Sequence, residues 1–161
     1  MTDTLIVLNH SVLFLCTSMY LGTGWSLILF SFPIAPKLTV DTYHMQFVPQ
    51  VKAATRFFTW MTMLMLLTAI VMIATEWRTG FLWVPIVVLL AVVAATLLTT
   101  SRILPLNRRM ETGITDDAEL RTILSRWMSL NRVRAGLWTV QWAAMMWFFA
   151  ARALAALRMA S

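Results

Sequence analysis

The chain has 161 residues, of which 60% are hydrophobic and only 12% are charged, and its formal net charge is +6. Soluble globular domains carry about 25% charged residues, so this composition excludes an ordinary soluble domain. The positive charge does not indicate a nucleic-acid-binding protein, because it gathers on one side of the expected membrane topology described below.

Four long apolar runs predict four membrane-spanning helices, at about residues 5–32, 57–75, 81–99 and 134–157. A helix of about 20 apolar residues crosses the hydrocarbon core of a bilayer. Each run should be helical, because backbone groups in lipid must satisfy their own hydrogen bonds. We therefore expect an all-α membrane protein, a single domain built as a four-transmembrane-helix bundle.

The first span is the most polar, and Ser18, Gly22 and Ser26 form a stripe of small residues along it that would let another helix approach closely. Pro33 and Pro36 should end this span. The following residues, 35–52, are expected to lie at the membrane interface with one short helix. A tight turn at residues 76–80 then makes the second and third spans antiparallel neighbours.

The largest loop, from residue 100 to about residue 130, should contain an amphipathic surface helix at about 116–131 that runs on into the fourth span. Thr115 is the expected N-cap, and the acidic residues that follow it suit the first turn of a helix. Alternating the loops across the membrane places ten of the 13 Lys and Arg on one side. Cytoplasmic loops carry such an excess. We therefore expect a bacterial inner-membrane protein with both termini in the periplasm or exterior and lipid as its immediate surroundings. The ten residues are Lys37, Lys52, Arg56, Arg102, Arg108, Arg109, Arg121, Arg126, Arg132 and Arg134.

One face of the last helix gathers polar and aromatic groups where that helix enters the membrane. At 100° per residue its members lie within about 40° of one line: Trp127, Asn131, Arg134, Trp138, Gln141 and Met145. Ionisable residues at such depth usually face a bundle interior or a cavity. An Arg fork beside an amide can bind a carboxylate, a phenolate or a phosphate. The alternative is that Arg134 extends to lipid phosphate while Asn131 bonds a neighbouring helix.

Histidine chemistry is limited in this chain, which contains only two His. His10 could act as an acid or base or as an axial haem ligand, or it could simply be a hydrogen-bonded interfacial residue. No metal site is expected, because an iron or di-iron site needs several His or carboxylates and no acidic residue falls inside a predicted span.

Several short motifs together resemble the anthrone oxygenase-like integral membrane proteins. They are Leu104-Pro105-Leu106-Asn107-Arg108 after the third span, then Arg126-Trp127, then Asn131-Arg132-Val133-Arg134, with Gly22-Thr23-Gly24-Trp25 and Phe30-Ser31-Phe32-Pro33 in the first span. The resemblance covers nearly the whole chain. It implies a cofactor-independent oxygenase that converts an anthrone to an anthraquinone, although most members have no assigned activity.

We therefore predict a small membrane oxidoreductase for an apolar aromatic or quinone-like substrate. Asn131 and Arg134 would stabilise the substrate anion, and His10 or His44 would act as base only if the fold brings it close. Substrate-binding residues would be Asn107, Arg126, Trp127, Trp138 and Gln141. The alternatives are a non-catalytic subunit of a larger membrane complex or homo-oligomer, and a haem-binding four-helix oxidase.

Overall fold

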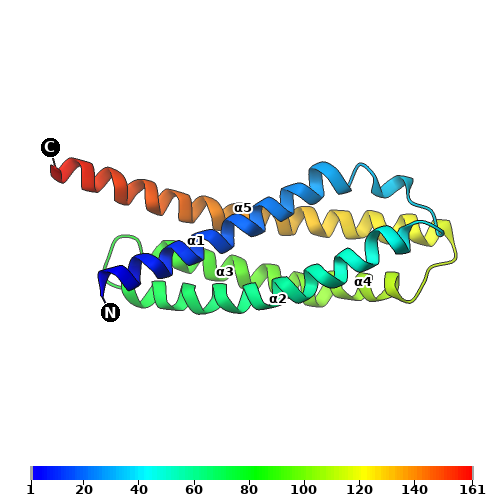
Figure 1. Ribbon diagram of the computed structural model, residues 1–161, viewed down its shortest axis with the longest axis horizontal. Helices are drawn as coiled ribbons and strands as arrows, with labels where there is room; N and C mark the ends of the chain where they lie inside the picture. The colour runs from blue at the N-terminus through cyan, green and yellow to red at the C-terminus, as the bar shows by residue number, and fades with distance from the viewer. Residues whose placement is uncertain (1, 161) are drawn as a thin grey trace.

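The computed structural model describes residues 2–160, and within them every regular element is a helix (Figure 1). The chain runs through α1 (Asp3–Ser26) and η1 (Leu27–Ser31), a short 3-10 turn η2 (Ala35–Lys37), α2 (Tyr43–Glu76), then α3 (Trp83–Leu98), η3 (Thr99–Ile103) and α4 (Leu104–Glu111), and finally α5 (Asp117–Ala160). Four helical stretches in this range are long and apolar enough to cross a membrane. The predicted all-α four-helix bundle is confirmed.

The second helix begins well before the predicted span. Residues expected at the interface in a short helix instead form the first turns of α2, which continues without interruption to Glu76. Pro49 lies inside it and cannot donate to the carbonyl of Met45. Both residues are exposed, so solvent or headgroups can reach that carbonyl. This explains why the proline does not end the helix.

The predicted surface helix and the fourth span are one continuous helix, α5, of 44 residues. At a rise of 1.5 Å per residue it is about 66 Å long, which exceeds the roughly 30 Å hydrocarbon core of a bilayer. Its N-cap is Asp116 rather than Thr115: the Asp116 carboxylate accepts from the backbone N–H of Ala118 at 3.2 Å and of Glu119 at 3.0 Å. An aspartate caps a helix at least as well as a threonine.

The buried residues form two separate clusters. The spanning core lies between α1, α2, α3 and α5, around Leu13, Met65, Met72, Val84, Val88 and Met145. The second cluster lies where α2 begins, α4 ends and α5 begins, around Tyr43, Phe47, Ile103, Met110, Leu120 and Trp127. We call this the basic end, because it carries the ten basic residues named above. It lies on the right in Figure 1.

At the basic end, Tyr43 links the start of α2 to the connection between α4 and α5 by hydrogen bonds. Its buried hydroxyl donates to the carbonyl of Met110 at 3.2 Å and accepts from the backbone N–H of Ile114 at 2.6 Å. One side chain thus satisfies two backbone groups of the connection between α4 and α5.

α1 approaches α5 closely at Gly24, and not at Gly22 of the predicted stripe of small residues. A Cβ atom on Gly24 would lie 2.8 Å from Cε3 of Trp138 and 3.1 Å from Cβ of Ala135, whereas a Cβ on Gly22 would meet nothing within 4 Å. Gly22 and Ser26 are exposed. Within residues 2–160, therefore, no helix packs closely on Gly22, and Gly24 positions Trp138.

Candidate functional site

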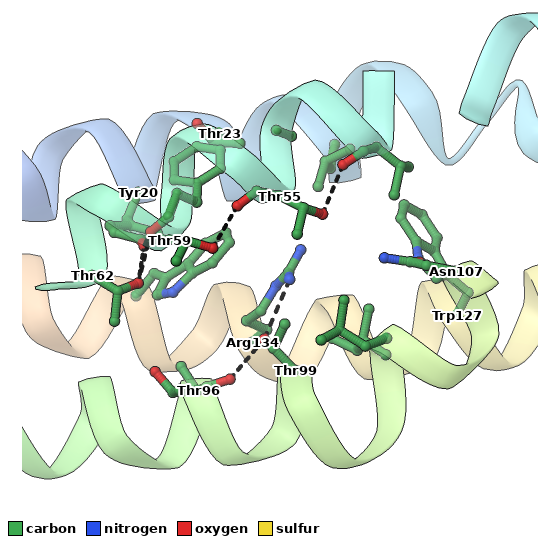
Figure 2. Close-up of a pocket in the computed structure, with 18 of the residues that line it drawn as sticks. Tyr20, Thr23, Thr55, Thr59, Thr62, Thr96, Thr99, Asn107, Trp127 and Arg134 are labelled. Atoms are coloured by element: carbon green, nitrogen blue, oxygen red, sulfur yellow. Dashed lines mark hydrogen bonds between the residues drawn. The ribbon is translucent and has the colours of Figure 1, made fainter. Parts of the chain in front are cut away.

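A cavity of about 820 Å³ lies between the spanning core and the basic end (Figure 2). Its walls come from the end of α1 and the segment that follows it (residues 27–38), one face of α2 over residues 46–66, the junction of α3 with α4, and α5 from Trp127 to Gln141. Most of the lining is apolar or carries hydroxyl groups. Exposed lining residues such as Ile34 and Met63 show that the cavity opens to the outside of the bundle.

Arg134 is the only charged residue that lines this cavity in the described part of the chain. Its guanidinium points into the cavity (Figure 2), donates to the side-chain oxygen of Asn131 and makes a long contact of 3.4 Å with Oγ1 of Thr99. Its Cζ atom lies 4.6 Å from the ring centre of Trp138, and its Nε atom has no partner. All of these neighbours are neutral, so the positive charge is not compensated by a carboxylate of the described residues.

Asn131 supports Arg134 from behind rather than facing the cavity. It is 2% exposed and does not line the cavity. Its Nδ2 donates to the carbonyl of Trp127 at 2.8 Å, which leaves Oδ1 to accept from Arg134. Asn131 therefore fixes the orientation of the guanidinium, as expected for a buried amide with a satisfied donor and acceptor.

The two motifs at the ends of the large loop meet at one side of the cavity. Nε1 of Trp127 in α5 donates to Oδ1 of Asn107 in α4 at 2.9 Å, and both residues line the cavity. The Trp127 ring also packs edge-on against Phe47, with ring centres 4.6 Å apart. Figure 2 shows the amide nitrogen of Asn107 on the cavity side, where it is a second hydrogen-bond donor besides Arg134.

The other side of the cavity is aromatic. Trp138 packs against Tyr20 with ring centres 4.8 Å apart and against Phe58 with ring centres 6.4 Å apart. The Tyr20 hydroxyl lies 2.9 Å from the carbonyl of Phe58 and 2.6 Å from Oγ1 of Thr62. Beyond Trp138, Gln141 lines the cavity with neither amide atom partnered. A buried polar group without a partner costs about 1 to 3 kcal/mol.

Two rows of threonine hydroxyls, which were not predicted from the sequence, line the cavity. Each donates to a carbonyl four residues earlier in its own helix, at 2.7 to 2.9 Å. A hydroxyl oxygen that donates can still accept, and Oγ1 of Thr99 already accepts from Arg134. The recognisable signal is their helical spacing within apolar spans. The residues are Thr55, Thr59 and Thr62 in α2, and Thr99 and Thr100 in η3.

His10 and Arg126, both predicted as site residues, do not line the cavity. His10 is buried at the opposite end of the bundle, where its Nε2 lies 3.2 Å from Oγ1 of Thr75 and its ring packs edge-on against Phe148 at 5.3 Å. Arg126 is exposed at the basic end. His44, the other candidate base, is also exposed and outside the cavity. The structure therefore brings Asn107, Trp127, Arg134, Trp138 and Gln141 together and leaves both histidines apart from them.

An ion pair near His10 was not anticipated from the sequence. Glu76, the last residue of α2, is 3% exposed and accepts from the guanidinium of Arg152 at 2.6 Å and from Oγ1 of Thr79 at 2.6 Å. The sequence placed Glu76 in the tight turn at residues 76–80, outside the spans. In the described residues no group of three or more His, Cys, Asp or Glu is arranged to hold a metal ion.

The cavity thus offers a fixed guanidinium, a neighbouring amide donor, acceptor hydroxyls and flat indole faces. Such a set can bind a flat apolar molecule with one anionic oxygen. Comparisons of the chain with protein-family models, with curated proteins and with solved structures find no match in any of the three.

Proposed function

We propose that this protein is an integral membrane protein that binds an apolar aromatic or quinone-like molecule in the cavity and stabilises an anionic oxygen of that molecule with Arg134. The observation that carries the proposal is the state of Arg134, a cation with only neutral partners that points into a largely apolar cavity. An ionisable residue at membrane depth is costly, so an anionic ligand is a physical reason for its presence.

The aromatic lining favours a flat ligand over a flexible acyl chain. The indoles of Trp127 and Trp138 lie on the two sides of Arg134 along α5. Ring pairs at offset or edge-on geometry add about 0.5 to 1.5 kcal/mol beyond the burial of apolar area. A fused-ring phenolate or enolate would place its charge at the guanidinium and its rings against the indoles.

The reaction we propose is a cofactor-independent oxidation, in line with the resemblance to anthrone oxygenase-like proteins. An anthrone loses a proton to give an enolate, which dioxygen then oxidises. The CH₂ carbon becomes the second carbonyl of the anthraquinone, and one molecule of water leaves. Arg134 would stabilise the enolate, which lowers the barrier to deprotonation. Since no imidazole or carboxylate of the described residues lines the cavity, the proton would pass to water at the open side.

The location that we propose is a bacterial inner membrane with the basic end in the cytoplasm. The support is the excess of Lys and Arg at that end, which is the usual bias of cytoplasmic loops. Both termini would then face the periplasm, and the cavity would lie at the depth of the inner leaflet.

The experiment is oxygen uptake by the purified protein with an anthrone, together with the affinity for 2-naphthoate as a non-reacting anionic probe. Arg134→Gln should weaken probe binding by about 10-fold to 150-fold, which corresponds to the loss of a charged hydrogen bond of about 1.5 to 3 kcal/mol, and should abolish uptake. Arg126→Gln is the matched control, because it removes an exposed charge of the same helix outside the cavity. Equal binding and uptake in both variants would refute the proposal.

A second candidate, a non-catalytic subunit of a larger complex or a homo-oligomer, is favoured by one observation. Gly22 and Ser26 of the small-residue stripe are exposed and no described helix packs on Gly22, so the stripe is open to another chain. Stoichiometric co-purification of another membrane protein, lost in Gly22→Leu, with unchanged probe affinity in Arg134→Gln, would favour this candidate. The haem alternative gains no support, because His10 lies outside the cavity.

A further inference from the structure

Gln141 is the most buried polar side chain of the cavity lining, and among the described residues it is the only buried side-chain amide without a hydrogen-bond partner. It is 1% exposed, it lines the cavity, and neither its Nε2 nor its Oε1 makes a hydrogen bond in the described structure. Buried polar groups in proteins are almost always hydrogen-bonded. A donor and an acceptor left open at the wall of a cavity therefore point to a polar group of the molecule that fills it.

The position of Gln141 relative to Arg134 is fixed by one helix. The two residues are seven positions apart in α5, so they lie on nearly the same face and about 10 Å apart along the helix axis. Trp138 lies between them on that face, with its ring against Tyr20 and Phe58. The order along the wall is therefore cation, flat aromatic surface, amide.

We propose that the ligand of this cavity carries a hydroxyl group at the end opposite its anionic oxygen, and that Gln141 recognises this hydroxyl. The proposal rests on the proposed function, since it takes the anion at Arg134 as given. A hydroxyl both donates and accepts, so it can satisfy either open atom of the amide. The spacing of about 10 Å along the helix suits two or three fused rings that lie over Trp138. The substrate class is thus a hydroxylated fused-ring compound rather than a plain aromatic acid.

The test compares two probes that differ by one hydroxyl: 2-naphthoate and 6-hydroxy-2-naphthoate. Their affinities are measured for the full-length protein in lipid nanodiscs, by titration of its tryptophan fluorescence. The variants are Gln141→Met, which keeps the side-chain length without the polar atoms, Gln141→Leu as a second apolar form, and Gln50→Met as the matched control. Gln50 lines the cavity from α2 but is exposed.

The expected result is a preference of the wild-type protein for the hydroxylated probe of about 10-fold, as for one well-formed hydrogen bond. Gln141→Met or Gln141→Leu should remove that preference and change the affinity for 2-naphthoate less than about 2-fold. Gln50→Met should keep the preference.

Two negative results separate the proposals. If wild-type protein binds both probes equally while Arg134→Gln weakens both, water satisfies Gln141, the hydroxyl inference is wrong and the anion site stands. If neither probe binds, or if Arg134→Gln binds both as well as wild-type protein does, the anion site itself fails. A preference that survives in both Gln141 variants would also overturn the inference.

Discussion

A methyl group added at Gly24 should destabilise the bundle, whereas one added at Gly22, two residues earlier in the same helix, should not. At Gly24 the new Cβ would lie 2.8 Å from Cε3 and 3.3 Å from Cζ3 of Trp138. The indole cannot turn away freely, because Tyr20 and Phe58 pack against it. Overpacking of this kind costs about 1 to 3 kcal/mol. At Gly22 nothing lies within 4 Å, and we expect a change within about 0.5 kcal/mol.

The assay is the free energy of unfolding in mixed micelles, titrated with a denaturing detergent and followed by circular dichroism. Gly24→Ala should lower it by about 1 to 3 kcal/mol relative to Gly22→Ala. In a Trp138→Phe background, where the smaller ring removes the clash, the cost of Gly24→Ala should fall below about 1 kcal/mol, because mutations of residues in contact are not additive. Equal free energies for the two alanine variants would show that α1 does not approach α5 at Gly24.

Three further outcomes follow from single contacts. Arg152→Met should destabilise the fold by about 2 to 4 kcal/mol because it leaves the carboxylate of Glu76 buried and unpaired. Glu76→Gln should cost less than about 1 kcal/mol, because Arg152 is 47% exposed and can be solvated. Detergent-induced unfolding measures both free energies, and equal costs would contradict the burial of Glu76. Tyr43→Phe should lower the free energy of unfolding by about 1 to 3 kcal/mol because the buried N–H of Ile114 loses its acceptor. Limited proteolysis should then cut the connection before α5 faster than in the wild-type protein. Asn131→Ala should weaken 2-naphthoate binding by about 10-fold because the cavity guanidinium loses the acceptor that orients it, and an unchanged affinity would show that this amide has no such role.

The helical periodicity of the last span predicted the part of the cavity wall that α5 supplies. Trp127, Arg134, Trp138 and Gln141 all line the cavity, because residues at 100° intervals share a face in any straight helix. That inference needs no knowledge of the neighbouring helices. It also placed Asn131 on this face, and only its role as a support behind Arg134 depended on the packing.

Other features depend on how helices far apart in the sequence align. The pairing of Glu76 with Arg152 depends on how the end of α2 aligns with the second half of α5, and the sequence of either helix alone does not determine that alignment. The threonine rows of α2 and η3 could not be recognised as cavity residues from the sequence. A threonine whose hydroxyl donates to a carbonyl of its own helix also occurs in helices that line no cavity. His10 drew attention by its residue type alone, and the topology puts it at the opposite end from the cavity.

Native mass spectrometry of the protein extracted from its own membrane tests the central claim most directly, because it reports what the cavity holds in the cell. We predict a bound small acidic aromatic molecule on the wild-type protein that is absent from Arg134→Gln and present on Arg126→Gln. A wild-type protein that carries no such molecule, or an Arg134→Gln variant that carries the same one at the same occupancy, would contradict a ligand site built around Arg134.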